Sequence, residues 1–170
     1  WDGHPCCAFA ASKEFITQTP NSYAALLRAI VEATAFASKA ENRKQIAEAI
    51  APANYLNAPV TVLEQVLTGT YADGLGGVKK DPDRVTFDPF PWDSFAVWML
   101  TQMKRWGYVK GDVAYAKIAK DVFLTSDAAK AMKDAGLTPP TGANKITVMG
   151  KAFDPSKPDA YVASFAIKRS

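Results

Sequence analysis

The stretch "WDGHPCCAFAAS", residues 1–12, decides the fold class, because it ends in a continuous run of small apolar residues. A short apolar run of this kind is typical of a buried β-strand. A second strand is predicted by "KITVMG", residues 145–150, and a brief third one by residues 85–87. Helical patterns dominate the remainder. We therefore expect an α/β fold that is rich in helices and has few, short strands.

Helices are predicted where apolar residues recur at spacings of three and four. We expect them over residues 23–39, 41–51, 61–68, 93–106, 112–123 and 126–135. Gly69 is the expected stop of the third helix, because glycine adopts the left-handed conformation that ends many helices. The stretch from residue 69 to residue 91 is rich in glycine and proline and is expected to be a loop.

Two of the predicted helices carry side chains of particular interest. A last short helix should begin near Ser156, which forms a capping-box pattern with Asp159, and Pro158 falls in its first turn. The helix over residues 93–106 has an aromatic-rich stripe that we interpret as core packing rather than a cofactor site. Its members are Phe95, Trp98, Met99, Met103 and Trp106.

The composition argues against two classes of partner. The net charge is only +3 over 170 residues, and the basic pair at residues 79–80 is followed at once by two acids. Nucleic-acid binding needs Lys and Arg clustered on one face, so we expect no nucleic-acid partner. No apolar run reaches the roughly 18 residues that a membrane-spanning helix needs.

The first seven residues concentrate reactive side chains. Asp2, His4, Cys6 and Cys7 are competent ligands for zinc, but the chain has no further His or Cys, and neighbouring residues of a strand point to opposite faces. A catalytic pair of His4 and Cys6 would lie on one side of the strand, yet no third residue is available to orient the imidazole. We therefore interpret the cysteines as small core residues, the usual role of buried free cysteine.

Two further kinds of site are compatible with the residues. Trp1, Gly3 and His4 could hold a small anion through an aromatic wall, backbone N–H groups and an imidazole, although a histidine beside a proline is often structural. Asp88 and Asp93, on either side of "PFPW", are candidates for a pair of carboxylates in general acid–base catalysis. Helix capping explains Asp93 more simply. No pattern in the chain indicates an enzyme.

Four blocks of the sequence, in order, carry a resemblance to a known family. They are "WDGHPCCAFAASKEFITQTPNSYAALLRAIVEA" (residues 1–33), "AENRKQIAEAIAPANYLNAPVTVLEQVLTG" (40–69), "FDPFPWDSFAVWMLTQMKRWGYVKGD" (87–112) and "VMGKAFDPSKPDAYVASFAIKR" (148–169). Together they resemble the nitrate/bicarbonate-type substrate-binding proteins of ABC transporters. The resemblance covers essentially the whole chain.

The resemblance implies a type II periplasmic-binding-protein fold, in which two α/β lobes close on a ligand. Members of the family are more than twice as long as this chain, so the chain is expected to correspond to the C-terminal part alone. Residues 1–20 are then the inter-lobe crossover strand, and residues 21–170 are the helix-rich C-terminal portion of the first lobe plus a tail.

The function that the resemblance implies is binding rather than catalysis. The ligand would be a small oxyanion, with nitrate as the first candidate and nitrite and bicarbonate as the others. The ligand-binding residues would be Trp1, Asp2, Gly3 and His4. Nitrate-type members tend to carry a lysine where Asp2 aligns, and an acid would repel an anion. No cofactor is expected, although calcium could accompany bicarbonate.

The same resemblance implies partners and a location. The protein is expected to be a monomer in the periplasm, or membrane-associated on its periplasmic side, and to dock on an ABC permease in the membrane. Two alternatives stay open on the same fold. One is a cytosolic nitrate-sensing regulator, and the other is an enzyme related to those that make a thiamine precursor.

Overall fold

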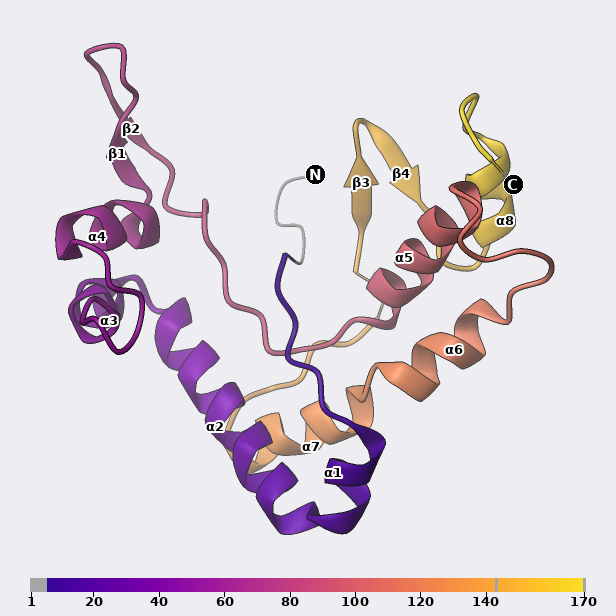
Figure 1. Ribbon diagram of the computed structural model, residues 1–170, viewed down its shortest axis with the longest axis horizontal. Coiled ribbons are helices and arrows are strands. Elements are labelled where there is room, and N and C mark those ends of the chain that lie inside the picture. The colour runs from indigo at the N-terminus through magenta and orange to yellow at the C-terminus, as the bar shows by residue number, and fades with distance from the viewer. Residues whose placement is uncertain (1–5, 143, 170) are drawn as a thin grey trace. The chain divides into compact units, whose positions relative to one another are not determined.

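The computed structural model describes residues 6–142 and 144–169, which divide into two compact units (Figure 1). The first unit comprises residues 12–89, and the second comprises residues 90–169 together with residues 6–11. The first unit contains α1 (Lys13–Gln18), α2 (Pro20–Ser38), the 3-10 helix η1 (Ala40–Asn42), α3 (Arg43–Ile50), α4 (Val60–Thr68), β1 (Thr70–Ala72) and β2 (Val78–Lys80). The second unit contains α5 (Asp93–Arg105), α6 (Tyr115–Val122), α7 (Thr125–Asp134), β3 (Ile146–Val148), β4 (Lys151–Phe153) and α8 (Pro158–Ala163).

The predicted class, helix-rich with few and short strands, agrees with these elements. The helices expected over residues 61–68 and 93–106 correspond closely to α4 and α5, and β3 lies within "KITVMG". The described residues form two separate antiparallel hairpins, β1–β2 and β3–β4. None of the described helices is both long and apolar enough to cross a membrane.

In the first unit, α3 packs against α4, and α4 ends at Gly69 as predicted. Gly69 has a φ of 67°, a conformation that other residues avoid. The Asp81 backbone N–H donates a 2.8 Å hydrogen bond to the Gly69 carbonyl. A Cβ atom at Gly69 would lie 1.7 Å from the Asp81 carbonyl oxygen. The turn out of α4 therefore requires glycine for two reasons, backbone conformation and close approach.

The buried centre of the first unit includes the guanidinium group of Arg43, at the start of α3. The Arg43 side chain is 6% exposed, and its Nη1 donates to the carbonyls of Leu67 at 2.8 Å and Pro82 at 2.7 Å. Its Nη2 donates to the Val85 carbonyl at 3.0 Å. Arg43 thus joins the end of α4 to the segment that follows β2. Residues 85–87 form no strand, so that prediction was wrong.

The hairpin β1–β2 lies in the stretch that we expected to be a loop. Its register pairs Thr70 with Lys80 and Ala72 with Val78. The Asp73 carboxylate accepts hydrogen bonds from the backbone N–H groups of Leu75 at 2.8 Å and Gly77 at 2.9 Å, which closes the turn. Aspartate and glycine in this arrangement are typical turn residues.

The second unit has an apolar core around α5, against which α6 and α8 pack. Edge-to-face ring contacts run from Phe153 to Tyr161, with centroids 4.9 Å apart, and from Tyr161 to Phe165, at 5.1 Å. The Trp98 indole N–H donates to the Tyr161 hydroxyl at 3.3 Å. The buried members of this core are Ala96, Val97, Tyr115, Ala119, Ile146, Phe153 and Tyr161.

The predicted core stripe of α5 is correct in part. Phe95 and Trp98 pack against the apolar core, whereas Met99, Met103 and Trp106 are each about two-fifths exposed. Ala96 and Val97 instead fill the centre of the contact, because small side chains let neighbouring elements approach α5 closely.

The chain after α8 is tied to the end of α5. The Arg105 guanidinium donates through Nε to the Ile167 carbonyl at 2.9 Å, and it lies over the Phe165 ring with its central carbon 3.8 Å from the centroid. The Arg169 backbone N–H donates to the Arg105 carbonyl at 2.7 Å. One arginine thus fixes this segment through a hydrogen bond, a cation–π contact and its own carbonyl.

Helix starts account for several differences from the predictions. Helix α1 was not predicted; Ser12 caps it by accepting from the Phe15 N–H at 3.1 Å. The expected capping box is absent, because Ser156 bonds to Asp154 and α8 begins at Pro158. Proline in the first turn is confirmed, since its fixed φ suits that position.

Candidate functional site

The four residues expected to bind ligand, Trp1, Asp2, Gly3 and His4, lie outside the described residues. The same holds for two of the four candidate zinc ligands, Asp2 and His4. Within the described parts of the chain, no group of three or more His, Cys, Asp and Glu side chains could hold a metal ion.

The segment that follows these residues is exposed. Residues 6–11 form no strand, and Phe9 is 63% exposed. The predictions that this segment is a buried strand and that its cysteines lie in the core are therefore wrong. The physical reason is that an apolar run becomes a buried strand only when other strands pair with it, and none of the described strands does so.

Cys6 and Cys7 are both free and exposed, and they lie side by side. Their Sγ atoms are 3.6 Å apart, in hydrogen-bond contact. The prediction that the two side chains point in opposite directions is wrong, because it assumed the regular pleat of a strand. The hydrogen bond with Cys6 and the charge of Cys6 raise the pKa of the Cys7 thiol.

Asp93, one of the two candidate catalytic carboxylates, is not the N-cap residue of α5. Asp93 is the first residue of α5, and the N-cap position belongs to Trp92, whose side chain makes no capping hydrogen bond. Capping is therefore the wrong explanation for Asp93. An acid in the first turn still interacts favourably with the helix dipole. The Oδ1 atom of Asp93 and the Oγ atom of Ser94 are buried without a hydrogen-bond partner among the described residues.

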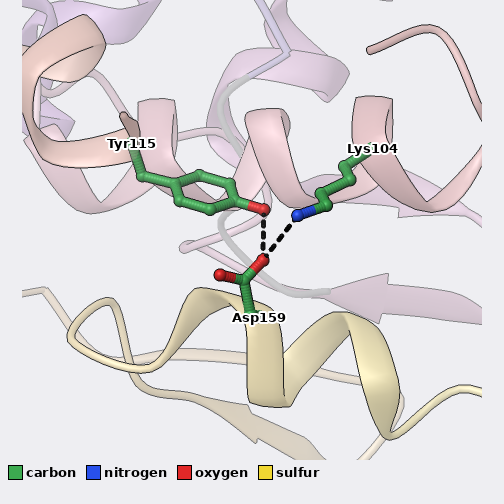
Figure 2. Close-up of polar contacts among 3 residues, drawn as sticks. All are labelled: Lys104, Tyr115 and Asp159. Atoms are coloured by element: carbon green, nitrogen blue, oxygen red, sulfur yellow. Dashed lines mark hydrogen bonds and ion pairs between the residues drawn. The ribbon is translucent and has the colours of Figure 1, made fainter. Parts of the chain in front are cut away.

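A polar cluster that the sequence did not indicate connects three helices of the second unit (Figure 2). Asp159 of α8 accepts two hydrogen bonds at its Oδ1 atom, one from the Lys104 ammonium group of α5 at 2.9 Å and one from the Tyr115 hydroxyl of α6 at 3.0 Å. The Lys104 Nζ atom also lies 5.9 Å from the centroid of the Tyr115 ring. We call these three residues the Lys–Tyr–Asp cluster.

The electrostatics of the cluster follow from these contacts. Burial of the phenol, followed by its hydrogen bond to Asp159, raises the pKa of Tyr115 to about 12. The hydrogen bond from Lys104 holds the pKa of the Asp159 carboxyl below its ordinary value. At neutral pH the cluster is a protonated tyrosine and an ion pair.

In this protonation state the cluster is better suited to stabilise the fold than to catalyse proton transfer. A general base at neutral pH needs a pKa near 7, and neither Tyr115 nor Asp159 is shifted toward that value. The contacts join α5, α6 and α8 around one carboxylate. Little in the sequence indicated the Lys–Tyr–Asp cluster, because its residues belong to three separate helices and Asp159 fitted a local capping pattern.

The comparisons with known proteins agree with the resemblance inferred from the sequence. A family model described as NMT1-like matches residues 1–51. The nitrate/nitrite binding protein NrtA of Nostoc is 31% identical over 99% of this chain and 41% of its own length. The bicarbonate-binding protein CmpA of Synechococcus elongatus is 28% identical over 100% of this chain and 42% of its own length. The nitrate import ATP-binding protein NrtC of Synechocystis is 23% identical over 99% of this chain and 26% of its own length.

A solved structure supports the fold. The crystal structure of the periplasmic nitrate-binding protein NrtA from Synechocystis matches with a TM-score of 0.79 and 23% sequence identity, over 92% of this chain and 43% of that chain. The similarity to nitrate/bicarbonate-type substrate-binding proteins and the expected fold class are thereby confirmed. The chain spans about two fifths of the length of the binding proteins that it matches.

Proposed function

We propose that this chain is part of the substrate-binding component of an ABC importer for a small oxyanion. Nitrate is the first candidate ligand, and nitrite and bicarbonate are the others. The observation that carries the proposal is the similarity to NrtA and CmpA along 99% and 100% of the chain. The ligand would be bound between two lobes that close on it, and no chemical step is involved.

The proposed ligand-binding residues are Trp1, Asp2, Gly3 and His4. An indole ring, a backbone N–H group and an imidazole suit a small anion, whereas the carboxylate of Asp2 does not unless a cation lies beside it. Asp2 therefore distinguishes between the candidate ligands. We propose that bicarbonate would bind together with calcium, whose charge offsets that of Asp2, and that nitrate would bind without a cation only with the Asp2 carboxylate turned away from it.

Calorimetric titration of the full-length gene product tests the ligand directly. Nitrate, nitrite and bicarbonate are titrated separately, each with calcium and with a chelator. Heat from one anion at a stoichiometry of one supports the proposal, and absence of heat from all three contradicts it. An effect of calcium confined to bicarbonate would favour bicarbonate as the ligand.

The site is tested with His4→Ala and Trp1→Ala, which we expect to weaken binding of the anion by about tenfold or more, since a good hydrogen bond to a charged group contributes roughly 1.5–3 kcal/mol. Phe9→Ala is the matched control, because it removes an exposed side chain from the same segment. Equal affinities of all three variants and the unaltered protein would remove residues 1–4 from the site.

The proposed partner is a membrane permease of the ABC type, and the proposed location is the periplasm. Two names support this assignment: the solved NrtA of Synechocystis is named as a periplasmic nitrate-binding protein, and the similar NrtC is named as an ATP-binding protein of nitrate import. The protein would act as a monomer. Recovery of the gene product in a periplasmic fraction, and stimulation of anion uptake by it, are the corresponding tests.

A second candidate function has its own support. The chain also matches about a quarter of NrtC, so a similar segment occurs in a protein that is named as an ATP-binding protein of nitrate import. The alternative is therefore an anion-sensing module that regulates transport from the cytosolic side. Recovery of the gene product in the cytosol, with anion binding that changes ATP hydrolysis, would favour this alternative over the first.

A further inference from the structure

Cys6 and Cys7 form an exposed pair of thiols that the proposed function does not use. They are the only two cysteines among the 170 residues, and both are free. Neither can therefore form a disulfide with any other residue of this chain. Their Sγ atoms lie 3.6 Å apart, close to van der Waals contact, so that each sulfur is the nearest thiol to the other.

We propose that Cys6 and Cys7 form a thiol–disulfide exchange site, at which small-molecule disulfides reversibly convert the pair into a vicinal disulfide. In the first step, the thiolate of one cysteine attacks a disulfide RS–SR, breaks its S–S bond and releases one RS⁻. In the second step, the other cysteine attacks the protein sulfur of the mixed disulfide and releases the second RS⁻. The cysteines lose two electrons and two protons, and RS–SR is reduced to two RSH.

The geometry favours the second step. Once one cysteine carries the small thiol, the other sulfur already lies beside the atom that it must attack, and exchange depends on access to that sulfur. The raised pKa of Cys7 favours Cys6 as the thiol that attacks first. Cys7 then displaces the small thiol from Cys6.

The surrounding backbone leaves room for ring closure. Residues 6–11 lie outside every described helix and strand, and no backbone hydrogen bond between described residues involves the peptide groups of Cys6 and Cys7. Both side chains are exposed, so a small disulfide has access. The backbone can rotate to close the ring without breaking a described hydrogen bond.

Ring strain makes the oxidised form reversible rather than structural. Adjacent Cα atoms are about 3.8 Å apart across a trans peptide. Most disulfides join Cα atoms at least about 4.4 Å apart, and distorted disulfides are more easily reduced. Strained and exposed disulfides are the labile ones. The pair should therefore be oxidised by a small disulfide and reduced again by the corresponding thiol.

Mass spectrometry of the intact, reduced protein after incubation with oxidised glutathione tests the proposal. We expect the unaltered protein to lose the mass of two hydrogen atoms and to lose both alkylatable thiols, with the link mapped to one peptide that contains Cys6 and Cys7. An excess of reduced glutathione should restore both thiols. Persistent glutathione adducts, covalent dimers, or thiols that stay reduced would each contradict the proposal.

The single variants Cys6→Ser and Cys7→Ser are the matched controls. Each should stop at one glutathione adduct, because neither variant retains a second thiol that could displace the bound glutathione. Because both side chains are exposed, we expect the circular dichroism spectra of the variants to match that of the unaltered protein. Loss of two hydrogen atoms in a single variant would overturn the assignment to this pair.

Discussion

In the first unit a buried guanidinium group binds backbone carbonyls, whereas in the second unit a buried cluster of aromatic rings fills an apolar core. Arg43 holds three carbonyls that belong to the end of α4 and to the segment after β2. Phe153 and Tyr161 instead contact each other across the second unit. The buried interior of the first unit thus includes a charged group with directional hydrogen bonds, whereas the aromatic cluster of the second unit is held by packed apolar area.

The largest effect is expected from the second unit. Phe153→Ala removes a buried ring that contacts Tyr161 and should lower the free energy of unfolding by about 4 kcal/mol, since such truncations leave a cavity. Urea unfolding of the whole protein measures this loss. Phe9→Ala, at an exposed position, is the control and should change little. Equal effects of the two variants would refute the aromatic core.

The hydrogen-bonded centre of the first unit is tested by Arg43→Met. The methionine keeps much of the apolar stem but leaves three carbonyls without a donor, which should cost about 3 kcal/mol. Hydrogen exchange should accelerate in residues 83–85 and at the end of α4, while the second unit keeps its protection. Arg28→Met, at an exposed arginine of α2, is the control. Unchanged exchange in residues 83–85 would contradict the role of Arg43.

The Lys–Tyr–Asp cluster is tested from its tyrosine. Tyr115→Phe removes the hydrogen bond to Asp159 and should lower the free energy of unfolding by about 1 kcal/mol at neutral pH. The pKa of Tyr115 is raised to about 12, so its contribution is present below the ordinary tyrosine pKa of about 10 and is lost as the pH rises toward 12.

Stability measured at pH 8 and at pH 11 separates this contribution. The unaltered protein should lose more stability over this interval than Tyr115→Phe does. Tyr108→Phe, which alters an exposed tyrosine, should behave as the unaltered protein does. If Tyr115→Phe loses as much stability between pH 8 and pH 11 as the unaltered protein does, then the pKa of Tyr115 is the same in the folded and the unfolded chain, which contradicts the account.

The smallest effect is expected from Asp159→Asn. The ion pair with Lys104 involves an exposed carboxylate, so its contribution should stay below about 1 kcal/mol. Because the pKa of Asp159 is lowered, this contribution is present above the ordinary aspartate pKa of about 3.9 and is lost as the pH falls through the folded-state pKa.

Acid unfolding curves measure that contribution. Asp159→Asn should show a shallower loss of stability on acidification than the unaltered protein. Asp121→Asn, which alters an exposed ion pair within α6, is the control. If Asp159→Asn and the unaltered protein lose the same stability on acidification, the Lys–Tyr–Asp cluster does not stabilise the packing of α8.

Local sequence signals predicted the elements that depend on local physics. Gly69 ends α4 and Pro158 opens the first turn of α8, because φ preferences act on one residue at a time. The helix α5 was placed within one residue at its end. These elements need no information about distant parts of the chain.

Predictions failed where distant residues decide the outcome. The three carbonyls that Arg43 binds come from two other segments, and no local pattern links them. The Lys–Tyr–Asp cluster draws on three helices in the same way. The apolar run at residues 8–11 was read as buried, but it has no partner strand among the described residues and is exposed. The proposed function rests instead on the family resemblance, which is carried by four ordered blocks of sequence rather than by a site.

The most direct test of the proposed function is calorimetric titration of the full-length gene product with nitrate, with chloride as the control anion. The account predicts saturable heat at one nitrate per protein and none with chloride. Nitrite and bicarbonate follow in the same buffer. Absence of saturable binding for all three oxyanions, with the protein folded throughout, would contradict the proposal that this chain serves anion uptake.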